Sequence, residues 1–250
     1  MLRNIFKMTG LFALVAFILA TLAFTSKEGK DVVCRSIEIK IEPNDVIKLN
    51  EKEITRLAQM ADEQLMGKNL RMINAELIER EVEKHKAILK AEVYKVVVKD
   101  TNSYAGILGV KVKHREPAVR IISTSGNFYL DKEGVRIPVS ANYAANVLVA
   151  TGYFSEQFAR EELLPFVLHL SKNEFWNAQA KQVHVEKDGN IIITPLVGSH
   201  LVELGTLENY PQKLRNMQQF YKQVMANNNW NKYEKISLKY KNQVIAKKRS

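Results

Sequence analysis

The most prominent feature of the hydrophobic pattern is an apolar run near the start of the chain. Residues 8–26 carry no charged side chain and are mostly Leu, Phe, Ala, Val and Ile. A helix needs about 20 apolar residues to cross a hydrocarbon layer about 30 Å thick, and no polar face interrupts this run. We therefore expect an uncleaved transmembrane helix at 8–26, a short cytoplasmic tail at 1–7, and the bulk of the chain outside the cytoplasmic (inner) membrane.

A cleaved signal peptide is the alternative interpretation of the same run. Arg3 and Lys7 would form its basic N-terminal region, and cleavage would follow the small residues near 21–23. The run is longer than the roughly 7–15 apolar residues usual for signal peptides, and the site lacks a clean A-x-A pattern. The pattern favours a signal anchor.

Beyond the apolar run, the periodicity predicts a compact first module. Ser36–Glu42 alternates between apolar and polar residues, which is typical of a half-buried strand. Asn50 and Asn74 each precede apolar residues at helical spacing and are suited to cap two helices. Two strands are then expected at 93–99 and 108–113.

This strand–helix–helix–strand–strand order, over residues 36–122, predicts an α+β module with two helices on one face of a three-stranded sheet. We expect Pro117 to leave the segment after it at a sheet edge or in a bend. The joint with the second module is expected near 124–126.

The second module, 126–250, is expected to be a mixed β domain with flanking helices. Gly-containing turns at 131–134 and 187–190 predict hairpins. Helices are expected at 161–170 and 211–225, the latter with Leu214, Met217, Tyr221 and Val224 inward. The last strands are expected at 236–240 and 244–246.

Net charge is +10, with 37 Lys and Arg against 27 Asp and Glu. Residues 201–250 hold ten of these cations and three of these acids. Such a surplus is compatible with nucleic acid, anionic lipid or wall polymer as a partner. The expected location outside the cytoplasm argues against nucleic acid, and plain solvation of an exposed end is the favoured explanation of the surplus.

The sequence contains no recognisable catalytic or metal-binding motif. The five histidines form no H-E-x-x-H pair, Cys34 is the single cysteine, and no phosphate-binding glycine loop occurs. We expect no catalytic, cofactor-binding or metal-ligating residues, and no enzymatic activity. A wall-acting hydrolase stays open as an alternative, because its two carboxylates need not be close in sequence.

The end of the chain offers a candidate binding strand. Ile236, Leu238 and Tyr240 alternate with polar residues, and an apolar run at 244–246 follows. A terminal strand at a sheet edge can accept a strand from a partner. Full internal pairing of this strand is the equally weighted alternative.

The order of several short motifs resembles the FtsQ family of cell-division proteins, called DivIB in some bacteria. Their order covers essentially the whole chain. The motifs are R-E-P-A-V at 115–119, Y-L-D-x-x-G-V at 129–135, V-E-L-G at 202–205, and the 236–244 stretch. Phe175-Trp176 and Asn242-Gln243-Val244 are most similar to the Bacteroidota branch.

The resemblance implies a POTRA domain followed by a β domain, and a non-enzymatic divisome scaffold. It implies binding of FtsB- and FtsL-like proteins, contact with septal synthases or peptidoglycan, and control of septal peptidoglycan synthesis. Strand addition at the C-terminal edge is the implied mode of binding. By position, the implied partner-binding residues are Leu238, Lys239, Tyr240, Asn242, Val244 and Ile245. A POTRA-containing envelope transport or assembly factor is the alternative from another class.

Overall fold

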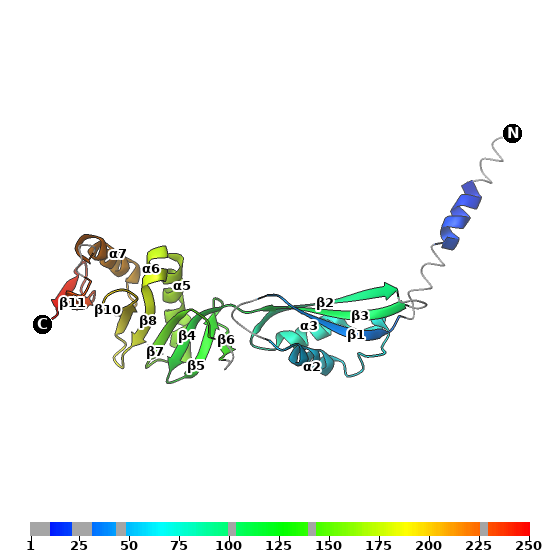
Figure 1. Cartoon of the computed structure of the whole chain (residues 1–250), viewed down its shortest axis with the longest axis horizontal. Coiled ribbons are helices and arrows are strands. Elements are labelled where there is room, and N and C mark those ends of the chain that lie inside the picture. The colour runs from blue at the N-terminus through cyan, green and yellow to red at the C-terminus, as the bar shows by residue number, and fades with distance from the viewer. Residues whose placement is uncertain (1–10, 22–31, 44–48, 100–103, 140–143, 226–229) are drawn as a thin grey trace. The chain divides into compact units, whose positions relative to one another are not determined.

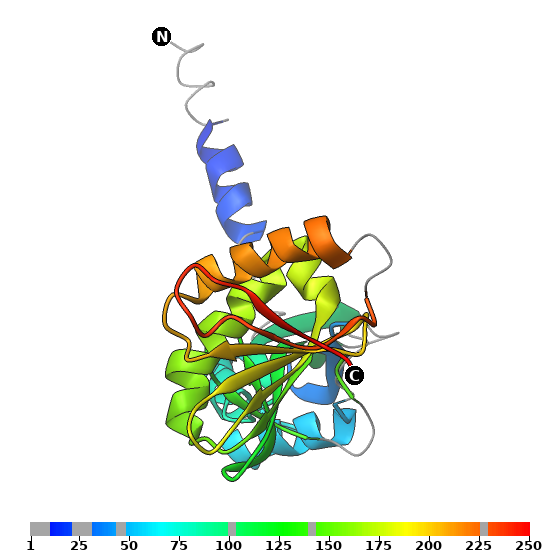
Figure 2. The same cartoon turned by 90° about the vertical axis from the view of Figure 1, so that its left-hand side faces the viewer.

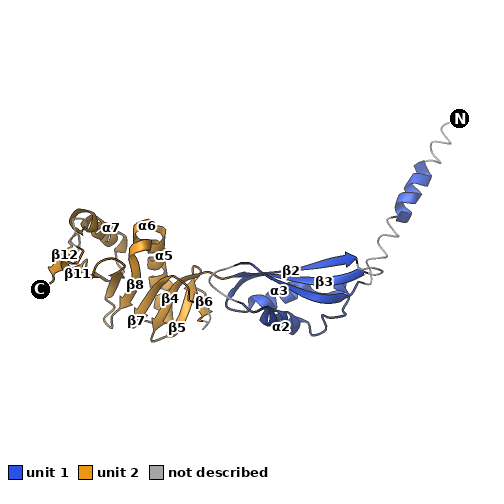
Figure 3. Ribbon diagram, viewed as in Figure 1, with its two compact units in different colours: residues 1–43, 49–114 blue, residues 44–48, 115–250 orange. Residues whose placement is uncertain are grey.

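A computed structural model describes residues 11–21, 32–43, 49–99, 104–139, 144–225 and 230–250. Residues 11–21 are helical, and the other described residues form two compact units, one ending at His114 and one starting at Arg115 (Figure 3). Within the described ranges, no helix has the length and apolar character needed to cross a membrane. The expected span, 8–26, extends at both ends into residues outside the described ranges and stays a prediction.

Unit 1 has the expected order of elements. Its three strands form a sheet in the order β1-β3-β2, with β1 parallel to β3 and β2 antiparallel to it. Two helices, α2 and α3, follow β1 and precede β2, and a short 3₁₀ turn, η1, lies between the two helices (Figure 1). The elements are β1 (Cys34–Ile41), α2 (Glu51–Ala61), η1 (Leu70–Met72), α3 (Ala75–Glu83), β2 (Ile88–Lys99) and β3 (Tyr104–His114).

The two helices of unit 1 begin where the asparagines predict. Asn50 Oδ1 accepts a hydrogen bond from Lys52 N–H (3.0 Å), and Asn74 Oδ1 accepts one from Leu77 N–H (3.1 Å). Each cap satisfies a backbone donor that lacks a partner within the helix. The helices bury an apolar face against one face of the sheet, and the central buried residues are Ile54, Ala58, Ile78, Val82, Leu108, Val110 and Val112.

The described residues of unit 2 form one nine-stranded sheet in the order β12-β11-β10-β9-β8-β7-β4-β5-β6. Helices α5 (Leu164–Lys172), α6 (Glu174–Gln179) and α7 (Tyr210–Phe220) lie along one face of this sheet (Figure 2). The strands are β4 (Pro117–Ser123), β5 (Gly126–Asp131), β6 (Arg136–Pro138), β7 (Leu148–Gly152), β8 (Ala180–Val185), β9 (Ile191–Pro195), β10 (Leu201–Gly205), β11 (Tyr233–Ser237) and β12 (Ile245–Lys248).

Strand β4 corrects two expectations. It lies inside the sheet between β5 and β7, so the segment after Pro117 is neither an edge nor a bend. Pro117 is the first residue of the strand, where a missing N–H costs little. Because β4 pairs within unit 2, residues 117–122 belong to the second sheet, and the division between the units precedes Arg115 instead of falling near 124–126.

The helices of unit 2 contain π turns that the periodicity did not predict. The helix expected at 161–170 is part of a continuous stretch, in which the π segment η2 joins two α-helical segments. Pro165 is the second residue after that π segment. These elements are α4 (Glu156–Phe158), η2 (Ala159–Leu163) and α5 (Leu164–Lys172), followed by α6 (Glu174–Gln179).

The second π segment changes which residue faces the core. Helix α7 (Tyr210–Phe220) continues into η3 (Tyr221–Met225). A π turn holds more residues than an α turn, so Met225 is buried where Val224 was expected, and Val224 is only half-buried. Leu214, Met217 and Tyr221 are buried as predicted.

Candidate partner-binding site

The C-terminal hairpin forms one edge of the large sheet. β11 lies inside the sheet, parallel to β10 with Val202 opposite Ile236, and antiparallel to β12 with Ile236 opposite Ala246. β12 is the last strand in the order, so among the described strands it pairs only with β11. The edge is therefore β12, while the strand expected at 236–240 is interior and ends at Ser237.

The backbone of β12 divides into groups that face β11 and groups that face outward. Arg249 N–H donates to Lys232 O (2.9 Å), which turns the amide of Arg249 toward β11. Successive residues of a strand direct their backbone groups to opposite sides. Ile245 and Lys247 therefore pair inward, and Ala246 and Lys248 direct their N–H and C=O groups away from the sheet.

The side chains of the edge segment are also divided. Val244 and Ala246 are half-buried and pack against the core of unit 2. Ile245, 48% exposed, and Lys247 project to solvent. A strand added at this edge would thus meet both an unpaired backbone and an exposed apolar side chain.

The loop between β11 and β12 carries the other predicted residues. Leu238 is buried in the core, and its N–H donates to Glu203 O (2.8 Å). Tyr240 is 59% exposed. Asn242 has a left-handed backbone with φ of 58°, a conformation that Asn tolerates better than most residues.

A hollow of about 440 Å³ separates this loop from the start of α7. Leu238, Lys239, Tyr240 and Asn242 line one wall. Lys213 lies on the opposite wall, where its Nζ donates to Thr206 O (2.9 Å), and burial lowers the pKa of its ammonium. Most of its lining residues have polar side chains, so the hollow offers a partner segment both hydrogen-bonding groups and the apolar stems of those side chains.

Glu203 of β10 fixes the base of the loop. Its Oε1 accepts hydrogen bonds from Lys235 Nζ (2.8 Å) and Lys239 Nζ (2.9 Å). Burial alone would raise the pKa of this carboxyl, but the two ammonium groups outweigh burial and lower the pKa to about 2. The same contact raises the pKa of Lys239. Glu203 is therefore a buried anion paired with Lys235 of β11 and with Lys239 of the loop that follows β11.

Gly205 makes the approach of Lys239 possible. Its φ of +80° is unfavourable for residues with a side chain, and a Cβ placed there would lie 3.0 Å from Lys239 Cγ. A side chain at this position would strain the backbone and displace the stem of Lys239. The V-E-L-G motif thus provides, at the end of β10, both the Glu203 carboxylate and the space beside Gly205 that the side chain of Lys239 occupies.

An aromatic cluster around Tyr221 holds Trp230, which lies in the segment that leads into β11. His200 Nε2 and the Tyr221 hydroxyl share a hydrogen bond of 2.7 Å. Tyr221 stacks on Trp230, with ring centroids 5.4 Å apart, and contacts Phe175 and Trp176. Burial lowers the pKa of His200 and raises that of Tyr221. Both groups are therefore held neutral inside the domain.

The six predicted residues do not form one surface. Four of them line the hollow, but the side chain of Leu238 belongs to the core. Val244 packs inward and Ile245 begins the edge strand. Sequence reasoning missed Glu203, Ala246 and Lys248; only the strand pairing shows that the backbone N–H and C=O groups of Ala246 and Lys248 face outward. For Glu203, the sequence signal is an acid on an otherwise apolar strand.

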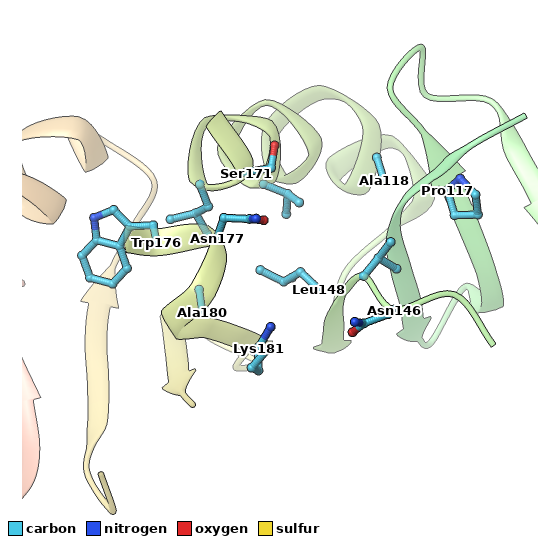
Figure 4. Close-up of a pocket in the computed structure, with 12 residues that line it drawn as sticks. Pro117, Ala118, Asn146, Leu148, Ser171, Trp176, Asn177, Ala180 and Lys181 are labelled. Carbon is cyan, nitrogen blue, oxygen red and sulfur yellow. The ribbon is translucent and has the colours of Figure 1, made fainter. Parts of the chain in front are cut away.

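A second, smaller cavity of about 230 Å³ lies beside α5 and α6, near the starts of β4, β7 and β8 (Figure 4). Trp176, Leu148 and Lys181 are among its lining residues. The Ser171 hydroxyl at its rim donates to Leu168 O (3.0 Å) within its own helix. The lining residues contain no carboxylate or histidine, so this cavity lacks the paired groups that acid–base chemistry requires.

Metal and thiol chemistry have little structural support in the described part of the chain. There, no group of three His, Cys, Asp or Glu side chains lies close enough to hold a metal ion. Cys34 is buried at the start of β1, and burial raises the pKa of its thiol. A thiol in this environment is poorly reactive.

Family comparisons agree with the two units. A model described as "FtsQ/DivIB, C-terminal related" matches residues 116–247, and a POTRA-like domain model matches residues 32–101. No curated protein matches the chain significantly. The first match begins one residue after the start of unit 2 and covers more than half of the 250 residues. The chain therefore belongs to the FtsQ/DivIB family.

Proposed function

We propose that this protein is a single-pass divisome scaffold in the cytoplasmic membrane that acts by binding and not by catalysis. FtsQ/DivIB membership suggests a scaffold role in cell division. The proposed partners are FtsB- and FtsL-like proteins, and the proposed outcome is control of septal peptidoglycan synthesis. The observation that carries the proposal is the unpaired side of β12, which terminates the sheet of the matched domain.

In this proposal a partner strand adds to β12. It pairs with the outward N–H and C=O groups of Ala246 and Lys248, as in other cases of strand addition. Ile245 gives the new strand an apolar contact, and Tyr240 extends the contact to the neighbouring loop. The pairing of Lys239 with Glu203 holds that loop in place before the partner arrives.

The test removes one outward amide and leaves the inward pairing intact. Ala246→Pro deletes the outward N–H, while Ile245 and Lys247 keep their inward ones; proline is tolerated at sheet edges for this reason. Ala246→Ser keeps the N–H and is the matched control. We expect Ala246→Pro, and not Ala246→Ser, to lose co-purification of the FtsB- and FtsL-like proteins from membranes.

The loop contribution is tested with a pair of exposed tyrosines. Tyr240 and Tyr153 are 59% and 51% exposed and both lie in unit 2. We expect Tyr240→Ala to weaken partner capture and Tyr153→Ala to leave it unchanged, with equal thermal midpoints for both variants. Full capture by both Ala246→Pro and Tyr240→Ala, with the fold intact, would remove the basis for strand addition.

The POTRA-like match favours one alternative, an envelope transport or assembly factor. Depletion in cells separates the two proposals. Filamentous, undivided cells support the division scaffold. Normal division combined with loss of outer-membrane proteins supports the assembly factor.

A further inference from the structure

The sheet of unit 1 has two unlike ends. Because β1 and β3 are parallel and β2 is antiparallel, the start of β1, the start of β3 and the end of β2 lie together. We call this the entry end, formed by residues 32–36, 94–99 and 104–108. In Figure 3, unit 1 is blue and the arrowhead of β2 marks the entry end.

The end opposite the entry end is a network of charges. Lys111 Nζ lies 2.8 Å from Glu42 Oε1, and Lys90 Nζ lies 3.1 Å from Glu92 Oε1. Lys113 lies beside the same groups. This is the ordinary surface of a sheet that faces water.

The entry end is apolar instead. Val96, Val97 and Val98 are 37%, 50% and 38% exposed. Successive residues of a strand point to opposite faces, so three consecutive exposed valines mean that this part of the hairpin is open on both faces. Tyr94 and Tyr104, 41% and 40% exposed, lie on the same two strands.

A neighbouring segment adds further apolar exposure. Gly67 N–H donates to Cys34 O (2.8 Å) and Leu70 N–H donates to Val32 O (3.0 Å), so residues 67–70 run beside the start of β1. The flanking Met66 and Met72 are 53% and 72% exposed. An open hollow of about 530 Å³ lies here, lined by Val32, Leu70, Arg71, Lys95 and Val97.

The charges at this end are basic. The entry end, residues 32–36, 94–99 and 104–108, contains Arg35, Lys95 and Lys99 and no acid; Asp100 follows it in sequence, outside the described residues. Lys95 Nζ donates to Ile73 O (2.6 Å), and Lys99 and Arg71 are exposed. Exposed apolar side chains with flanking cations are typical of surfaces that bind anionic membranes.

The chain itself reaches unit 1 at this end. Val33 is held by a hydrogen bond from Gly106 N–H to its carbonyl (3.0 Å) and by a bridge to Asn69. Five residues, 27–31, separate Val32 from Ser26, the last residue of the apolar run. Even fully extended, six residue steps span only about 20 Å. If residues 8–26 span the bilayer, the entry end stays about that close to its surface.

We propose that the entry end of unit 1 docks on the surface of an anionic bilayer. Val96, Val97, Val98 and the two tyrosines sit at the level of the lipid head groups, and Lys99 and Arg71 contact lipid phosphates. The inference rests on the membrane anchor of the proposed function. It adds a second membrane contact, which fixes the orientation of unit 1 relative to the membrane.

The test uses the full chain reconstituted into vesicles of phosphatidylcholine and phosphatidylglycerol. Spin labels are attached at Val97→Cys or, as control at the opposite end, at Lys113→Cys, each with Cys34→Ala. The expected result is a several-fold lower accessibility to a water-soluble nickel chelate at position 97 than at position 113. Charge reversal of both Arg71 and Lys99 to Glu should raise the accessibility at position 97.

Two controls separate the failure of this inference from the failure of the anchor. Extraction by alkaline carbonate would show that residues 8–26 do not hold the chain in the membrane. Resistance to carbonate with equal chelate accessibility at positions 97 and 113 would overturn the docking inference and leave the anchor intact. Shielding of position 97 only after FtsB- and FtsL-like proteins are added would also overturn it, because the surface would then bind protein.

Discussion

The Nζ atom of Lys239 lies 2.9 Å from Oε1 of Glu203 and ties the loop after β11 to the neighbouring strand β10. Lys235, on β11, reaches the same oxygen. One buried carboxylate therefore joins two strands and the loop that leads to the edge strand. This relationship makes the stability of the C-terminal hairpin sensitive to the charge of a single residue.

Glu203→Gln should destabilise unit 2 by about 1–2 kcal/mol, since the two lysines lose their counter-charge but remain partly exposed and hydrated. The folded pKa of about 2 lies below the ordinary 4.5, so the stabilisation is present above pH 4.5 and disappears as the pH falls toward 2. Urea unfolding as a function of pH measures both effects. Glu234→Gln, which removes a surface pair with Lys247, is the control and should change the stability much less, because water and salt screen an exposed pair.

His200 should make unit 2 less stable in mild acid. Burial lowers its pKa below the ordinary 6.5, so below that pH the unfolded chain takes up a proton before the folded one. Stability is therefore complete above pH 6.5 and falls as the pH is lowered. Both tryptophans, Trp176 and Trp230, lie next to Tyr221, so tryptophan fluorescence during unfolding reports this region.

Two variants separate the titration from the hydrogen bond. His200→Gln should flatten the loss of stability below pH 6.5. Tyr221→Phe keeps the ring but removes the hydroxyl, and should cost about 1 kcal/mol at neutral pH while the acid slope persists. An unchanged slope in His200→Gln would assign the acid sensitivity to another group; His114 of unit 1, whose pKa burial also lowers, is the next to change.

Two glycines in left-handed conformations should respond very differently to alanine. At Gly152, with φ of +120°, a Cβ would lie 2.1 Å from Val185 O, whereas at Gly189, with φ of +81°, it would meet nothing within 4 Å. Gly189→Ala should therefore cost about 1–2 kcal/mol of backbone strain, and Gly152→Ala should cost about 3 kcal/mol or more because the β7–β8 contact must also open. Thermal unfolding of the two variants measures the difference, and equal costs would contradict this account.

The elements of unit 1 were predictable because local signals and tertiary structure agree there. Asn50 and Asn74 cap the predicted helices, and the alternation at 108–112 matches the buried residues of β3. The position of β4 inside the second sheet was not predictable. Its partners β5 and β7 are set by long-range pairing, and Pro117 at the strand start looks the same in sequence as a proline that ends a strand.

The candidate site was only partly predictable for a related reason. Tyr240 and Ile245 are exposed as a binding surface requires, but Leu238 is buried because β11 lies inside the sheet. Which strand forms the edge depends on the parallel pairing of β10 with β11, segments some thirty residues apart. The π turn that turns Met225 inward likewise leaves no trace in a 3.6-residue periodicity.

The central claim is that a partner strand pairs with β12, and residue-resolved amide hydrogen exchange of the full chain tests it most directly. Without partners, the amides of Ala246 and Lys248 should exchange fast, and those of Ile245 and Lys247 more slowly. In the complex with the FtsB- and FtsL-like proteins, we predict strong protection of Ala246 and Lys248. Fast exchange at both residues within a stable complex would contradict strand addition at this edge.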